Sequence, residues 1–155
     1  MDTILGFLVA LTLFSAAGFT GECLYNGLEP VIRSLIRKER IDWRLQGAVS
    51  LWCIPVYGLS AAVGYHLVAA TLFPDFFDMP WPLRGAAYVA GIYLWEMLWG
   101  LVTERVLGRC LWQYRDSRYR LFRYINPWFA PIWFGFGFIL EWTERCIIPA
   151  IVGCC

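Results

Sequence analysis

The sequence predicts an all-α integral membrane protein folded as a four-helix bundle. Hydrophobic residues make up 59% of the 155 residues and charged residues only 16%, whereas a soluble domain is about half apolar and about a quarter charged. Four apolar stretches are long enough to cross about 30 Å of hydrocarbon. Nine Trp, eight Tyr and eleven Phe fit a small bundle with aromatic belts at both membrane interfaces. We therefore expect a single transmembrane domain over residues 1–155.

The first two helices are expected at residues 4–28 and 49–72. No basic residue precedes the first apolar stretch, and it is longer than the hydrophobic region of a signal peptide, which has about 7–15 residues. Pro30 should weaken the helix just beyond its expected end. Residues 45–74 contain no Asp, Glu, Lys or Arg, and Pro55 should bend the first turns of the second helix.

The third and fourth helices are expected at residues 84–107 and 125–152. The short, acidic and proline-rich connection PDFFDMPWP precedes the third helix. The fourth helix carries Glu141, and Pro127 and Pro131 should interrupt it near its start.

The basic residues predict how the chain is oriented in the membrane. Connections 29–48 and 108–124 hold five and six basic residues, counting Arg105 with the second. The segment before the first helix has none, and the connection between the second and third helices has only Arg84 at its edge. By the positive-inside rule the two basic connections are cytoplasmic and both termini lie outside. We place the protein in the bacterial inner membrane.

The two halves of the chain resemble each other. Glu22 is followed thirty positions later by the motif WxxP at residues 52–55, and Glu96 is followed by the same motif at residues 128–131. Two helices in each half predict a parallel internal repeat of two helical hairpins, with its axis along the membrane normal. Chance similarity in an aromatic-rich sequence is the alternative. If the repeat is real, Glu22 and Glu96 occupy equivalent places in the bundle.

Two acids within apolar stretches predict the functional site. Glu22 and Glu96 have no basic residue at helical spacing, and an intramembrane carboxylate is costly enough to suggest function. Each must be protonated, hydrogen-bonded, paired across helices or exposed to a cavity. Structural hydrogen bonding with Tyr57, a tryptophan or Thr103 is the alternative. We predict a cytoplasm-facing cavity with these substrate-binding residues: Glu22, Trp52, Tyr57, Trp95, Glu96, Glu104 and Trp128.

Other charged residues have structural interpretations. Glu141 and Arg145 have the i, i+4 spacing of a helical ion pair, which is their favoured role. Glu104 lies close to Arg105 and Arg109, so a solvated carboxylate at the interface competes with its place in the cavity. Four arginines interleaved with aromatic residues suit an interfacial helix that binds anionic lipid headgroups, with topological charge as the alternative: Arg115, Arg118, Arg120 and Arg123.

The sequence gives little support for catalysis or for a bound metal. The six cysteines have no CxxC or Cys/His spacing, and no nucleophile–base arrangement is evident. We therefore expect no catalytic residues, no metal site and no cofactor. His66 is the only histidine, and we interpret it as a packing residue. Nucleic-acid binding is not expected, because arginines beside a membrane are explained by topology.

Five motifs occur in order along the chain: GECLYNG, SLWCIPVYG, YLWEMLWGLVTERVLG, LWQYRD and NPWFAPIWFGFGFILEW. Together they resemble the ABC-transporter type IV family, which includes the bacterial CmpB-like proteins and an animal group of uncharacterised transmembrane proteins. The resemblance covers most of the chain and implies a multi-helix membrane protein. The chain departs from the family at LWQYRD, where Gln113 and Arg115 stand in place of an acid and a serine.

These observations predict a transporter-like component for a small cationic or amphiphilic solute. Because 155 residues enclose little pore, we expect a homo-oligomer or a partner membrane subunit, surrounded by membrane lipids. One alternative is a non-catalytic subunit or assembly partner of a larger membrane complex. Another is a lipid-binding or lipid-modifying protein acting at the cytoplasmic face through Glu104, Gln113, Tyr114 and Asp116.

Overall fold

The computed structural model describes residues 3–112 and 123–153, and this part of the chain is helical apart from turns and loops. Some of the helical pieces are short 3₁₀ or π segments that continue or precede an α-helix. The elements in chain order are α1 (Thr3–Arg37), α2 (Cys53–Ala61), η1 (Ala62–Leu72), η2 (Pro74–Asp78), α3 (Trp81–Leu107), η3 (Pro127–Phe129), α4 (Ala130–Trp142), η4 (Thr143–Ile147) and α5 (Ile148–Val152).

Three helices of the described chain are long and apolar enough to cross a membrane: Ile4–Arg37, Cys53–Leu72 and Trp81–Leu107. Their length and composition are consistent with the integral membrane protein expected from the sequence. The fourth helical stretch is divided, because the π-helical η4 separates the 13 residues of α4 from α5.

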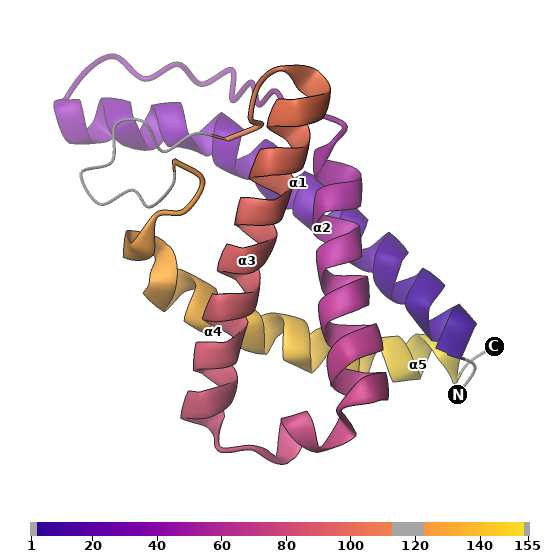
Figure 1. Ribbon diagram of the computed structural model, residues 1–155. Coiled ribbons are helices and arrows are strands. Elements are labelled where there is room, and N and C mark those ends of the chain that lie inside the picture. Colours follow the sequence, from indigo (N-terminus) through magenta and orange to yellow (C-terminus); the bar gives the residue numbers. More distant parts are fainter. Residues whose placement is uncertain (1–2, 113–122, 154–155) are drawn as a thin grey trace.

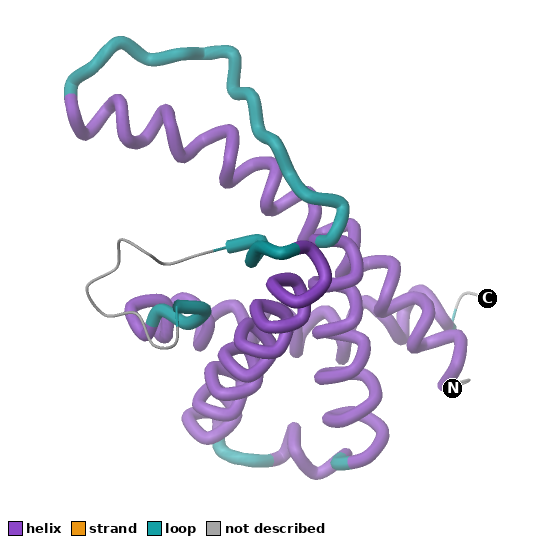
Figure 2. Tube along the Cα trace, turned by 45° about the horizontal axis from the view of Figure 1, so that its top comes forward, coloured by secondary structure: helices purple, strands orange, loops and turns teal. Residues whose placement is uncertain are grey.

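The helices are arranged around one hairpin. The continuous helix α2–η1 and the helix α3 run side by side and are joined at one end through η2 (Figure 1). Helix α1 crosses this hairpin obliquely and packs most extensively against α2. The stretch α4–α5 lies across the hairpin, so that the C-terminus comes close to the N-terminus (Figures 1 and 2). The predicted bundle of two equivalent hairpins stays a prediction.

Helix α1 is longer than the sequence indicated. The predicted end at residue 28 is wrong, because the helix continues through Pro30 to Arg37. A proline removes one intrahelical hydrogen bond, and the Glu29–Arg33 ion pair bridges the same turn. The helix stops after Arg37 because Lys38 takes a left-handed φ of 56°, and the Glu39 N–H donates to the Ser34 carbonyl at 2.9 Å. This is the hydrogen-bond pattern of a Schellman motif.

Prolines mark the starts of the other helices. The predicted start of the second helix at residue 49 is wrong, since α2 begins at Cys53 and Pro55 lies in its first turn. A missing N–H is tolerated there, so Pro55 starts the helix instead of bending it. Pro82 likewise lies in the first turn of α3, which begins at Trp81 instead of residue 84.

The fourth helical stretch follows the same rule. Pro127 and Pro131 lie in the first turns of η3 and α4. The predicted interruption of a longer helix by these prolines is therefore wrong. The Asn126 side chain accepts a hydrogen bond from the Trp128 N–H at 3.2 Å and so caps this start. Helix α3 ends at Leu107, the predicted residue, because Gly108 takes a left-handed φ of 68°.

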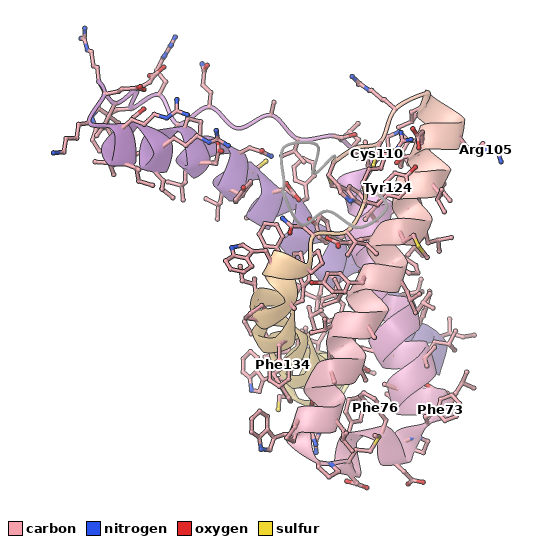
Figure 3. The ribbon with its side chains drawn as sticks, turned by 60° about the vertical axis from the view of Figure 1, so that its left-hand side comes forward. Phe73, Phe76, Arg105, Cys110, Tyr124 and Phe134 are labelled. Atoms are coloured by element: carbon pink, nitrogen blue, oxygen red, sulfur yellow. The ribbon has the colours of Figure 1, made fainter. Side chains whose placement is uncertain are left out.

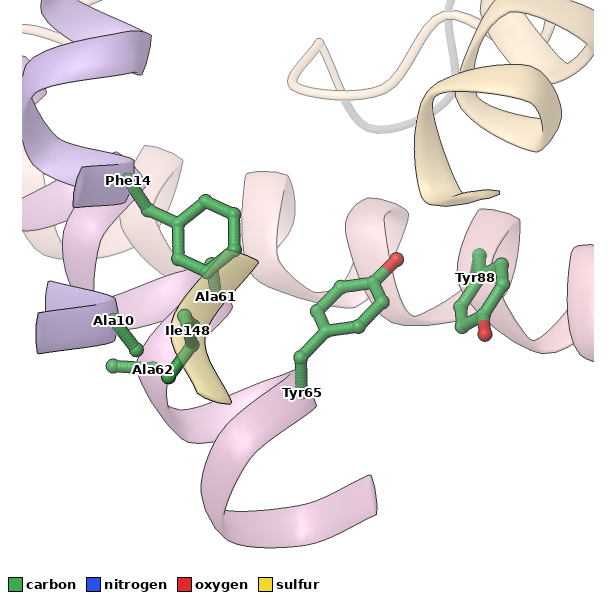
Figure 4. Close-up of a cluster of buried hydrophobic side chains, with 7 residues drawn as sticks. All are labelled: Ala10, Phe14, Ala61, Ala62, Tyr65, Tyr88 and Ile148. Atoms are coloured by element: carbon green, nitrogen blue, oxygen red, sulfur yellow. The ribbon is translucent and has the colours of Figure 1, made fainter. Parts of the chain in front are cut away.

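Two buried clusters hold the helices together. The larger one joins α1, α2–η1, α3 and α5 through Ala10, Phe14, Ala61, Ala62, Tyr65, Tyr88 and Ile148 (Figure 4). The smaller one contains Cys110, Tyr124 and Ile125 and lies beside the last turns of α3, where Tyr124 packs over Gly100 (Figure 3). The cavity described next is lined by Tyr65 and Tyr88 of the larger cluster and by Trp112, which packs against the smaller one. It therefore lies between them.

Candidate functional site

A cavity of about 440 Å³ lies among α1, α2–η1, α3 and α4. Most of its wall is apolar or aromatic. Two acids lie in this wall, Glu22 from α1 and Glu96 from α3. The two acids singled out from the sequence thus face one common space.

Glu22 is held by two neutral donors. The Tyr57 hydroxyl donates to Glu22 Oε1, and Asn26 Nδ2 approaches Oε2 at 3.4 Å. The tyrosine can lie there because Gly18 leaves room, since a β-carbon at Gly18 would be 2.2 Å from the Tyr57 ring. A glycine on α1 therefore determines where the partner of Glu22 on α2 is placed.

Glu96 of α3 and Glu22 of α1 lie at a similar height along α2. Trp95, the neighbour of Glu96, donates from Nε1 to the Val56 carbonyl of α2 at 2.9 Å. Val56 directly precedes Tyr57, which binds Glu22. The two carboxylates therefore lie near the same turn of α2, one from α1 and one from α3.

The cavity is polar at one end and apolar at the other. Tyr57 and Ser60 lie with the two acids, whereas Val68, Phe73 and Phe76 form the wall toward η2. At 1.5 Å per helical residue, the 16 residues from Tyr57 to Phe73, which follows the end of η1, span about 24 Å. The space suits an elongated guest with a positive group at one end.

Three residues predicted in the cavity wall do not line it: Trp52, Glu104 and Trp128. Trp52 precedes α2, and Trp128 in η3 is 76% exposed. Both tryptophans belong to the WxxP motifs, which stand at the starts of the second and fourth helical stretches. Of the predicted set, Glu22, Tyr57, Trp95 and Glu96 line it.

Glu104 belongs to a separate site near the end of α3. Arg123 Nη1 donates to Glu104 Oε1 at 2.8 Å, and the Tyr124 hydroxyl donates to Oε2. This hydrogen bond to the carboxylate raises the pKa of Tyr124 above its usual value of 10. Of the four arginines assigned to lipid headgroups, only Arg123 is described. The other three, Arg115, Arg118 and Arg120, lie outside the described residues, as do Gln113, Tyr114 and Asp116.

Glu141 lies in a network that the sequence predicts only in part. Arg145 Nη1 donates to Glu141 Oε1 at 3.2 Å, which is the ion pair expected from i, i+4 spacing. Two further donors come from α3, namely Arg84 Nε at 3.0 Å and the Tyr88 hydroxyl, both to Oε2. Arg84 also donates to the Phe77 carbonyl at 2.9 Å and so ties α3 and α4 to η2. Sequence spacing gives no signal for contacts between helices.

His66 is buried and bonded to Glu144. Its Nδ1 lies 2.7 Å from Glu144 Oε1, and both side chains are almost fully buried. This contact between η1 and η4 fits the packing role expected for His66. Glu144 was not singled out from the sequence, because nothing near it in the chain marks it as the partner of a residue 78 positions away.

Comparison with known proteins finds no matching family model, no matching curated protein and no matching solved structure. The resemblance to the CmpB-like proteins thus stays a prediction based on the five sequence motifs.

Proposed function

We propose that this protein is a transporter-like membrane component that binds a small amphiphilic cation in the cavity between α1, α2–η1, α3 and α4. The observation that carries the proposal is the placement of Glu22 and Glu96 together at one end of an otherwise apolar, aromatic cavity. A carboxylate pair attracts a cationic group, and Trp95 beside it offers a ring face for a cation–π contact. Val68, Phe73 and Phe76 would cover the apolar body of the guest.

Proton coupling is part of this proposal. Two carboxyl groups that face one apolar space are stabilised by binding either protons or a cation, because isolated buried charges are costly. A guest cation would then displace a proton from the Glu22–Glu96 pair. Binding should therefore weaken as the solution becomes more acidic.

We further propose the orientation indicated by the arginines. Connections 29–48 and 108–124 would face the cytoplasm of a bacterium and both termini would lie outside, with four spans forming two hairpins of a parallel repeat. The carboxylate end of the cavity would then open toward the cytoplasm, since α1 and α3 both continue from their glutamates toward a basic connection. A homo-oligomer or a partner subunit would complete the pathway.

The test is binding and uptake of benzyltrimethylammonium, an aromatic cation with its charge at one end, by the purified chain in proteoliposomes. Replacing Glu96 or Glu22 by Gln should weaken binding by about 10-fold to 100-fold, the effect of removing one charge-assisted contact. The matched controls are Glu104→Gln on α3 and Glu29→Gln on α1, because neither residue lines the cavity. Unchanged binding and unchanged pH-coupled uptake in Glu96→Gln and Glu22→Gln would overturn the proposal.

A further inference from the structure

The end of α1 and the chain that returns from it form a projecting unit, residues 28–45, which we name the basic arm (Figures 1 and 2). Helix α1 has 35 residues. At 1.5 Å per residue it is about 52 Å long, whereas the hydrocarbon core of a bilayer is about 30 Å thick. The last third of the helix therefore exceeds what a membrane span requires.

The helical part of the basic arm is amphipathic. Leu28, Ile32, Leu35 and Ile36 have the spacing i, i+4, i+7, i+8 of one helix face, and all four are exposed, Ile36 by 76%. Glu29, Arg33 and Arg37 follow one another at i, i+4, i+8 along the adjacent face. An exposed apolar face beside a charged one is typical of a helix lying in a membrane interface.

The returning chain meets α1 again at residues 45–47. A β-carbon at Gly47 would lie 2.3 Å from the Cys23 carbonyl oxygen, and one at Gly27 would lie 3.0 Å from the Leu45 carbonyl oxygen. At these two glycines the backbone of the return is in direct contact with α1. Trp43 on the return is 70% exposed, and an exposed tryptophan beside basic residues is typical of the headgroup region.

The basic arm carries excess positive charge. Two of its three acids are in ion pairs, Glu29 with Arg33 and Asp42 with Arg44, the latter at 2.6 Å. Because Arg44 donates hydrogen bonds to it, the Asp42 carboxyl has a pKa lowered to about 2 and stays ionised. Three basic residues of the arm lie outside these pairs, Arg37, Lys38 and Arg40, and all are exposed. Glu39 is the one acid of the arm outside these pairs, so positive charge is in excess.

We propose that the basic arm lies in the membrane interface, with its apolar face against the lipid chains, and binds the headgroups of anionic phospholipids through Arg37, Lys38 and Arg40. Such a surface gains affinity from apolar burial and from each basic residue near an anionic leaflet. Its continuity with a membrane-spanning helix keeps it at the bilayer surface. This inference does not depend on what the cavity binds.

The experiment uses the full chain in bilayer nanodiscs of phosphatidylcholine with or without phosphatidylglycerol. The triple variant Arg37→Gln, Lys38→Gln, Arg40→Gln removes the excess charge. The matched control Glu29→Gln, Arg33→Gln alters the same segment and keeps the net charge. Native mass spectrometry measures how strongly phosphatidylglycerol is retained over phosphatidylcholine. We expect the triple variant to lose this preference by about tenfold or more and the control to keep it.

A second measurement reports the position of the arm. The fluorescence of Trp43 is obtained as the difference between the wild type and Trp43→Phe in phosphatidylglycerol nanodiscs. Lipids brominated on their chains should quench this Trp43 fluorescence. Equal lipid preference in the triple variant and the wild type, or a Trp43 signal that brominated lipids leave unchanged, would overturn the proposal. A double variant, Ile32→Asn with Ile36→Asn, provides a third test. If it converts a dimer to a monomer and leaves the lipid preference unchanged, the apolar face binds a second copy of the chain and the proposal is overturned.

Discussion

Tyrosine hydroxyls satisfy several of the partly or fully buried carboxylates in the described chain. Tyr57 donates to Glu22, Tyr88 to Glu141 and Tyr124 to Glu104, each from a segment distant in sequence. A hydroxyl supplies a hydrogen bond without adding a second charge that must also be desolvated. A protein with few basic residues inside its helical body can hold acids in this way.

The contact of Tyr124 with Glu104 gives a prediction for alkaline pH. Its raised pKa means that the folded state keeps the neutral phenol, so the stabilisation is fully present below pH 10 and is lost as pH rises through the raised pKa. We expect the Tm for thermal unfolding in detergent to fall more over this alkaline range in the wild type than in Tyr124→Phe. Glu104→Gln should bring the pKa of Tyr124 back toward 10. Superimposable pH profiles for the wild type and Tyr124→Phe would contradict this role.

At the scale of helices, glycines determine how closely the elements approach. Gly58 of α2 faces α1 closely, and Gly85 of α3 and Gly137 of α4 each receive an aromatic ring from the opposite helix. Phe134 packs over Gly85, and Tyr88 packs over Gly137. Small residues at helix contacts let van der Waals packing hold helices together within a membrane, where apolar burial between helices adds little.

Gly58→Ala should separate α1 from α2. A β-carbon there would lie 2.0 Å from Ser15 Oγ and 2.8 Å from the Leu11 carbonyl oxygen, so the backbone must shift. We expect a loss of about 1–3 kcal/mol in the free energy of unfolding, as for overpacked cores. The matched control is Gly64→Ala, because no atom lies within 4 Å of its added β-carbon. Denaturant unfolding in detergent measures both, and equal stabilities would rule out the close approach.

At the scale of the whole molecule, Glu141 connects α4 to the α2–α3 hairpin. Its carboxylate is 7% exposed and accepts from both Arg84, which is 16% exposed, and Arg145, which is 50% exposed. Arg84 also holds the chain between η2 and α3 through backbone carbonyls. The network includes Tyr88, which also lines the cavity, so the position of α4 over the cavity depends on this network.

The two arginines on this carboxylate should differ in their contribution to stability. Arg84→Gln removes the more buried of the two cationic partners of Glu141, and we expect a loss of about 2–3 kcal/mol, because Arg145 and Tyr88 remain on the carboxylate. Arg145→Gln removes a half-exposed partner and should lose about 0–1 kcal/mol. Thermal and denaturant unfolding of the two variants provide the comparison. A larger loss for Arg145→Gln than for Arg84→Gln would show that α4 is held in another way.

Local features of the helices were predicted better than their lengths. The end of α3 at Leu107 and the Glu141–Arg145 contact depend on neighbours within one or two turns, so the chain itself encodes them. Residue 28 is too early for the end of α1, because Pro30 removes one hydrogen bond but does not stop a helix with favourable turns on either side of it. Residue 49 is too early for the start of α2, because Pro55 is tolerated in the first turn of a helix and disrupts hydrogen bonding only in its interior.

The sequence by itself determined the helical, membrane-compatible class and the approximate places of three long apolar helices, because composition and hydrophobic run length are properties of the chain alone. It also pointed to Glu22 and Glu96, since a carboxylate within an apolar run is conspicuous without any structure. Only the tertiary structure decided that these two acids line one cavity, while Trp52, Glu104 and Trp128 do not. Hydrogen bonds spanning 35, 57 and 78 positions along the chain depend on which helices pack together, and no local spacing carries that information.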